Sequence, residues 1–278
     1  LVSLNVGSRG NAGFEVKLIT ASQDLHSGRY GGIVRNALHE MARLVSGLHD
    51  ADGRVAAPGF YDGVREPSEH ERAEIHSIAY DSSRLLSEIG AVPHGEKGYS
   101  TLERLWLRPT LDVNGMWGGY TGAGSKTVIA NEASAKITMR LVEGQDPVAA
   151  QESVMRHLEA NTPEGVRLEF TGERGASGAY TVPLDHPLLK AASNALEATT
   201  GMVPRRVRIG ASLPLTEIVH RLLGLHTIMF SFALSDENFH APNEFFRLDS
   251  ISDGLAAWVR ILREIAESDV ADYAPYRH

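Results

Sequence analysis

Cysteine is absent from this sequence of 278 residues. Its absence excludes disulfides, thiolate metal ligands and cysteine nucleophiles together. Twelve histidines are left as the main nitrogen ligands and proton carriers. Metal binding or proton transfer by this chain would therefore depend mainly on imidazoles.

Basic charge and long apolar runs are also scarce. The 27 Lys and Arg residues stand against 35 Asp and Glu residues, for a formal net charge of -8. Because phosphate binding needs a basic surface, we expect no nucleic-acid partner. No apolar run is long enough to span a bilayer, and no leader of charged, apolar and small residues opens the chain. We therefore expect a cytoplasmic protein without a membrane partner.

The first ten residues, LVSLNVGSRG, begin without Met and have the pattern of a strand that runs into a turn. A chain that starts within a strand is expected to be part of a longer polypeptide.

Residues 13–172 alternate between strand and helix patterns. Period-two alternation predicts strands at 13–20, 110–119, 132–142 and 166–172. Helical spacing predicts one helix within 31–48 and a second after Asp146, with Pro147 at its first position. Residues 49–109 are expected to hold a loop, a helix near 68–90 and another loop. The apolar faces predicted for the two helices comprise Ile33, Ala37, Met41, Leu44 and Leu48 in the first, and Val148, Met155 and Leu158 in the second.

The resulting order is strand, helix, strand, strand, helix, strand. This order is typical of the split-βαβ, ferredoxin-like arrangement, an antiparallel sheet with two helices on one face.

After residue 178 the pattern changes to a helix at 185–201, a strand at RRVRIG, a helix at SLPLTEIVHRLLG and an apolar strand at LHTIMFSF. A last helix at 249–267 is predicted to turn Ile251, Leu255, Val259 and Leu262 inward. We therefore predict an α+β unit inserted into a larger α/β domain.

Two glycine-containing turns hold candidate site residues. In QDLHSGRYGG, His26 lies between a strand and a helix, where side chains can project into a cleft. The alternative is a capping turn in which Asp24 or Ser27 serves the helix and His26 lies on the surface. In GYTGAGSKTVIANEA, Lys126 and Thr127 could reach an anion, although an ordinary wide hairpin would have the same pattern.

Two further stretches could hold an anionic group. Arg140 shares a strand face with Lys136 and Thr138, so its guanidinium could grip a carboxylate or simply face solvent. Gly210 and Ser212 precede a helix whose first-turn amides suit a carboxylate or an oxyanion, unless Ser212 is only the N-cap.

The segment SDENFHAPNEFF places His240 among carboxylates and phenylalanines. Acidic neighbours favour a bound cation and aromatic side chains exclude water, so His240 is a candidate metal ligand. A single imidazole does not make a metal site, and the other ligands have to come from elsewhere.

Taken together, these stretches resemble the M20 family of metallopeptidases, particularly its dipeptidase and carnosinase-like branch. DLHSGRYGG, GAGSKTVI, ITMRLV, GASLP and ENFHAPNE occur in the family's order. The resemblance implies a dinuclear-zinc catalytic domain of α/β type, interrupted by a ferredoxin-like lid that makes a homodimer. It divides the chain into the end of a first catalytic segment (1–11), the lid (12–177) and a C-terminal catalytic segment (178–278).

The resemblance also implies roles for individual residues. His240 matches the last metal ligand, and His26 matches a lid histidine that reaches the partner subunit's active site. Thr127 and Arg140 match lid residues that hold the substrate's C-terminal carboxylate. Gly210 and Ser212 match a segment that lines the substrate site.

Two departures from the family pattern limit the prediction. The family's other metal ligands lie upstream of the lid in a His-x-Asp motif, a Glu-Glu pair and a later Asp, and the first two motifs are missing here. Some relatives have a substrate-contacting histidine near ERGASGAY (173–180), which this chain lacks.

We therefore predict metal-dependent hydrolysis of dipeptides or other short peptides by the parent enzyme, with two Zn2+ ions per site and Mn2+ or Co2+ as alternatives. This chain is expected to be inactive alone because it lacks most of the ligands. An N-acyl or N-carbamoyl amino acid amidohydrolase and a non-catalytic lid and dimerisation fragment remain as alternatives.

Overall fold

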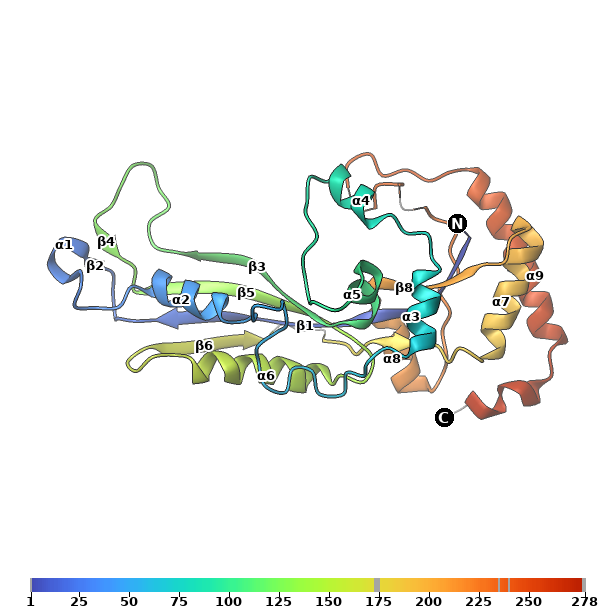
Figure 1. The fold of residues 1–278 in the computed structure, drawn as a ribbon, viewed down its shortest axis with the longest axis horizontal. Coiled ribbons are helices and arrows are strands. Elements are labelled where there is room, and N and C mark those ends of the chain that lie inside the picture. Colours follow the sequence, from blue (N-terminus) through green and yellow to red (C-terminus); the bar gives the residue numbers. More distant parts are fainter. Residues whose placement is uncertain (1, 173–175, 235, 240, 277–278) are drawn as a thin grey trace. The chain divides into compact units, whose positions relative to one another are not determined.

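A computed structural model describes residues 2–172, 176–234, 236–239 and 241–276. It is a mixed α/β structure whose contacts define two units. We call Arg9–Ala179 the sheet unit, and Leu1–Ser8 together with Tyr180–His278 the terminal unit (Figure 1). The boundaries predicted from the family resemblance stay predictions.

The sheet unit is built on four antiparallel strands in the order β3-β5-β1-β6. These are β3 (Thr110–Gly118), β5 (Glu132–Leu141), β1 (Ser3–Ile19) and β6 (Arg167–Gly172). In the centre of the sheet, Phe14 pairs with Ile137 on one side and with Gly172 on the other. Strand β1 is continuous from Ser3, so the turn predicted within LVSLNVGSRG is wrong.

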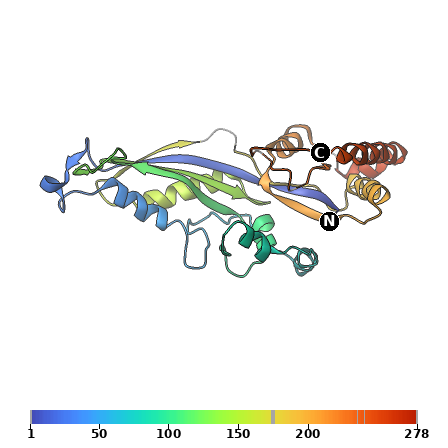
Figure 2. The ribbon, with the colours of Figure 1, turned by 90° about the horizontal axis from the view of Figure 1, so that it is seen from above.

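Two helices cover one face of this sheet, as the sequence predicted. Figure 2 shows α2 (Ala37–Ser46) and α6 (Pro147–Ala160) on the same side of the strands. Asp146 caps α6 by accepting a hydrogen bond from the amide of Ala149. The core between helices and sheet comprises, among others, Phe14, Leu18, Met41, Leu44, Ile137, Met139, Val154 and Leu158.

Both predicted helix faces need a correction at their first residue. Ile33 is 76% exposed because α2 begins only at Ala37, after the cap Asn36. Val148 is 60% exposed in the first turn of α6, and the helix is buried instead through residues that include Ala150 and Val154.

Residues 49–109 form an insert with three helices, α3 (Glu69–His76), α4 (Ser82–Glu88) and α5 (Thr101–Leu107). The sequence predicted one helix near 68–90, which is two helices here, and it missed α5. The missed signal is a capping box, in which Ser100 and Glu103 each bond the other's backbone amide.

The terminal unit combines the start of β1 with β7 (Tyr180–Thr181) and β8 (Arg205–Ser212), which both pair with β1. Its helices are α7 (Pro187–Thr200), α8 (Pro214–Leu223) and α9 (Asp249–Glu267), followed by the 3-10 helix η1 (Val270–Tyr276). The core includes Leu4, Val6, Val182, Leu189, Leu196 and Ile261.

Two predictions for the terminal unit are wrong. Residues 225–232 form no strand, and their only pairing with the described chain is an isolated bridge from Met229 to Asn5. Helix α9 packs on α7, and its buried residues are not those of the stripe predicted to face inward, which is exposed. The buried residues of α9 are Gly254, Ala257 and Ile261, and the exposed ones include Ile251, Leu255, Val259 and Leu262.

Candidate functional site

His26 and Thr127 lie side by side at one end of the sheet unit. The short strands β2 (Leu25–His26) and β4 (Val128–Ile129) pair, with His26 opposite Val128. The amide of Ser27 donates to the carbonyl of Thr127 at 3.0 Å. Figure 1 shows these strands beside the short helix α1 (Ser27–Tyr30). The two stretches that the sequence singled out separately therefore form one exposed loop pair.

The imidazole of His26 is fixed by its own helix. Its Nδ1 accepts a hydrogen bond from the amide of Gly28 at 3.0 Å, so His26 is the N-cap of α1. Neither Asp24 nor Ser27 is the cap, since Asp24 accepts instead from the amide of Asn131 and Ser27 is the first residue of α1. An Nδ1 that accepts leaves the proton of the neutral ring on Nε2. The exposed ring of His26 can therefore offer an Nε2 donor to a carbonyl oxygen.

Arg140 lies on the face of the sheet that the helices leave open. It alternates with the buried Met139 and Leu141, and it shares its side of β5 with Thr138, as the sequence predicted. In register it is flanked by Asn11 on β1 and Thr110 on β3. These neighbours come from distant parts of the chain, so sequence spacing does not reveal them.

A second guanidinium influences this region. Burial, and then the charge of Arg140, lower the pKa of Arg9 to about 10, while Asp112 acts in the opposite direction. Arg140 and Arg9 therefore lie close enough for their charges to interact, and the surroundings favour an anion.

His26 and Arg140 do not meet within one copy of the sheet unit. Strand β5 pairs with β1 from Glu132, opposite Ile19, to Arg140, opposite Asn11. At about 3.3 Å per residue, the eight steps from Glu132 to Arg140 span about 26 Å. His26 and Thr127 lie beyond the Glu132 end.

Gly210 and Ser212 belong to the terminal unit, at the end of β8 and directly before α8. The N-cap of α8 is Leu213, which makes no side-chain capping hydrogen bond, and Pro214 follows at the first helical position. Simple capping by Ser212 is therefore not observed. The first-turn amides of α8 retain the polarity that suits an anion.

His240 lies outside the described residues. The contacts of the acidic residues near it change the expectation that these carboxylates favour a bound cation. The carboxylate of the fully buried Glu237 accepts from the amide of Leu234 at 3.0 Å and from Nη1 of Arg247 at 3.2 Å. Asp236 forms a two-point ion pair with Arg247, at 2.9 and 2.7 Å. These two carboxylates are engaged by Arg247 and the backbone.

The aromatic residues of this loop do not form a water-excluding wall. Phe239, Phe245 and Phe246 are each between 44% and 52% exposed. Within the described part of the chain, no group of three or more His, Asp or Glu side chains is arranged to hold a metal ion.

The comparison with known protein families concerns mainly the sheet unit. Residues 6–166 match the peptidase dimerisation domain of the M20 family. This chain therefore belongs to the M20 peptidase family. Among the described helices, none has the length and apolar character that crossing a bilayer requires.

Within this family the chain is similar to dipeptidases. The Cys-Gly metallodipeptidase dug1 of Schizosaccharomyces pombe is 27% identical, over 95% of this chain and 56% of its own length. The human Beta-Ala-His dipeptidase is 26% identical over 95% of this chain and 53% of its own. The structure of the M20 metallo-carboxypeptidase Sso-CP2 of Sulfolobus solfataricus superposes with a TM-score of 0.82 at 29% identity, over 94% of this chain and 60% of that one. The chain thus spans about half the length of these relatives.

Proposed function

We propose that this chain is the ferredoxin-like lid and the C-terminal catalytic portion of a metal-dependent dipeptidase that works as a homodimer. The observation that carries the proposal is the separation of His26 from Arg140 along β5. Two groups that far apart serve one small peptide only if they come from different copies of the chain. The match to a dimerisation domain supports this arrangement.

In this proposal each residue of the site has one task. Arg140 grips the C-terminal carboxylate of the peptide, which accounts for a preference for short substrates. The guanidinium of Arg140 can donate two parallel hydrogen bonds to one carboxylate, which a lysine ammonium cannot do with the same geometry. Gly210 and Ser212 present the start of α8 to the substrate.

The second copy contributes the other end of its sheet unit. Nε2 of the partner's His26 would donate to the scissile carbonyl oxygen and stabilise the negative charge that develops there. Because Thr127 is attached to the His26 strand pair, it would enter the site from the same copy as His26. The C-terminal carboxylate would then be held by Arg140 of one copy and Thr127 of the other.

The metal is part of the proposal for the whole protein. The S. pombe relative is named a metallodipeptidase, and zinc, two ions per site, is our proposed cofactor, with Mn2+ or Co2+ as alternatives. The described residues do not fit such a site by themselves, since no cluster of three ligands is present among them. We therefore assign no chemical step to the metal and keep only His240 as a proposed ligand.

A substrate panel tests the proposed activity. Purified native protein containing this chain would be assayed with metal against dipeptides, dipeptide amides, N-acyl amino acids and N-carbamoyl amino acids. We expect turnover of dipeptides and little turnover of the amides. Faster turnover of the N-acyl or N-carbamoyl compounds would show an amidohydrolase instead.

The 278-residue chain alone provides the second test. We expect it to show neither stoichiometric zinc nor turnover, and to keep its dimer interface. Stoichiometric zinc with turnover in this polypeptide would contradict the proposal that ligands are missing. A native protein without any hydrolase activity would favour a non-catalytic lid and dimerisation module.

A further inference from the structure

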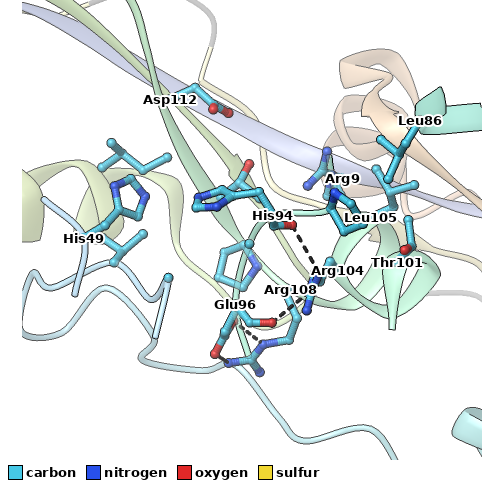
Figure 3. Close-up of a pocket in the computed structure, with 17 residues that line it drawn as sticks. Arg9, His49, Leu86, His94, Glu96, Thr101, Arg104, Leu105, Arg108 and Asp112 are labelled. Atoms are coloured by element: carbon cyan, nitrogen blue, oxygen red, sulfur yellow. Dashed lines mark hydrogen bonds and ion pairs between the residues drawn. The ribbon is translucent and has the colours of Figure 1, made fainter. Parts of the chain in front are cut away.

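We propose that the insert of the sheet unit forms a binding site for a small organic carboxylate with an apolar body. A cavity of about 410 Å³ lies between the insert and the β1 and β3 strands. Its size is within the range of small-molecule sites, and apolar and charged side chains both line it. Figure 3 shows His49 across the cavity from Leu86 and Leu105.

The charges around this cavity leave an excess of one positive charge. Three cations and two carboxylates line it. They are Arg9, Arg104 and Arg108, and Glu96 and Asp112. Burial lowers the pKa of His49, so its imidazole is neutral at neutral pH. An anion therefore complements the cavity better than a cation does.

Arg104 is the cation that the structure leaves best placed for a ligand. The carboxylate of Glu96 accepts two hydrogen bonds of 2.8 Å from the guanidinium of the buried Arg108. Among the described residues, the side chain of Arg104 donates only to carbonyl oxygens, those of Glu96 at 2.7 Å and His94 at 3.1 Å. In the described part of the chain no carboxylate lies within ion-pair distance of its guanidinium. Carbonyls orient the guanidinium without cancelling its charge.

The apolar wall faces the same space as Arg104. Thr101, Arg104 and Leu105 are spaced three and four residues apart on α5, so they share one face of the helix. Leu86 of α4 and the buried Val55 extend this wall. A branched alkyl group fits there, while its carboxylate reaches Arg104.

The cavity is held open by backbone contacts between two loops of the insert. The amide of Lys97 donates to the carbonyl of Asp52 at 2.9 Å, and its ammonium pairs with the Asp52 carboxylate at 2.6 Å. Gly53 has a φ of +76°, and a Cβ there would lie 2.8 Å from the carbonyl of Gly95. The loop with His49 and the loop with His94 are therefore fixed to each other, so the cavity is formed before a ligand arrives.

Calorimetry on the 278-residue chain tests the site with three probes of one shape. The probes are 4-methylpentanoate, its neutral amide and the cation 3-methylbutylamine. We expect the carboxylate to bind at least about tenfold more tightly than the amide, since one charge-assisted contact is at stake, and the amine not to bind. Equal binding of acid and amide, or no binding of the acid, would overturn the proposal.

Variants locate the bound carboxylate. Arg104→Met removes the cation, and Leu86→Glu places a like charge in the cavity without touching the bonds of Arg104. Both are expected to weaken binding at least about tenfold. The exposed Arg156→Met on α6 is the matched control and is expected to bind as the parent chain does.

Leu86→Glu keeps the test valid if Arg104→Met disturbs the insert. Unchanged affinity in Leu86→Glu would overturn the proposal. Arg140→Met separates this site from the proposed substrate clamp. Binding lost in Arg140→Met but retained in the two cavity variants would assign the probe to Arg140 and reject the cavity site. Because binding is measured without turnover, the result does not depend on the proposed peptidase activity.

Discussion

His26 combines a structural contact with a proposed chemical one, and a pair of variants separates them. His26→Asn retains a side chain that caps helices well, whereas His26→Ala removes the cap as well. If the imidazole stabilises the oxyanion, both variants of the native enzyme lose about 100-fold in kcat with unchanged metal content. Steady-state kinetics and metal analysis check this.

His39→Ala, an exposed histidine on α2, is the control and is expected to be neutral. Full activity of His26→Asn would show that His26 only caps α1.

Arg140 is expected to act on substrate affinity. Arg140→Met should raise KM for dipeptides by about 10- to 100-fold, the effect of losing charge-assisted hydrogen bonds. Dipeptide amides, which lack the carboxylate, should be affected far less. Kinetics on matched pairs of acid and amide measure this, with Lys136→Met on the same sheet face as control. An equal loss for acid and amide would contradict the clamp.

At the residue scale, alternation was sufficient to place Arg140 but not to find its neighbours. The period of two puts Arg140 opposite Met139, because successive strand residues point to opposite faces. Its flanking residues Asn11 and Thr110 depend on the register of three strands, which no local pattern encodes. The engagement of Glu237 by Arg247 is a similar case, since the two are ten residues apart and form their contact through a loop.

Among the elements, α3 is expected to carry a pH-dependent part of the stability. The hydrogen bonds from Arg65, and then those of the capping box at Ser68, lower the pKa of Glu71 from 4.5 to about 2. A lowered carboxyl pKa stabilises the fold above the unfolded pKa, and this stability is lost as the pH falls from 4.5 towards 2.

Urea unfolding at several pH values should therefore show a smaller decline below pH 4.5 in Glu71→Gln than in the parent chain. The exposed Glu159→Gln on α6 should leave the decline unchanged. Identical slopes in the Glu71 variant and the parent would contradict the assignment.

Periodicity predicts that a helix has an apolar stripe, but it does not say what covers the stripe. The strongest apolar stripe of α9 includes Leu255 and Leu262, yet these two are exposed while Gly254 and Ala257 are buried, with Phe232 next to Gly254. Tertiary packing thus overrides the pattern, because the neighbours of a helix decide which of its faces is buried. Conversely, α5 is short and was hidden in a Gly- and Pro-rich region, although its capping box was readable at Ser100.

For the molecule as a whole, the proposed function needs two copies of the chain. One copy has the His26 and Thr127 pair at one end of its sheet and Arg140 toward the other. The strand and helix order of the sheet unit was predictable because local patterns are strong there. A second copy was expected only from the family resemblance, because the separation of His26 from Arg140 follows from the length of β5 and the register of its pairing, which local patterns do not encode.

Subunit mixing tests this central claim most directly. The native enzyme would be prepared as His26→Asn and as Arg140→Met, and equal amounts would be unfolded and reassembled together. Activity would be measured at dipeptide concentrations far below KM, where a lower kcat and a higher KM each leave little activity. Half of the randomly formed dimers are mixed, and one of the two sites in each has both groups intact. We therefore expect recovery of about a quarter of the parent activity.

Mixing His26→Asn with Thr127→Ala is the matched control, because both changes lie at the same end of the sheet unit and no dimer then has a complete site. The account predicts recovery with Arg140→Met and none in this control. No recovery in the first mixture, or equal recovery in both, would contradict a site shared between subunits.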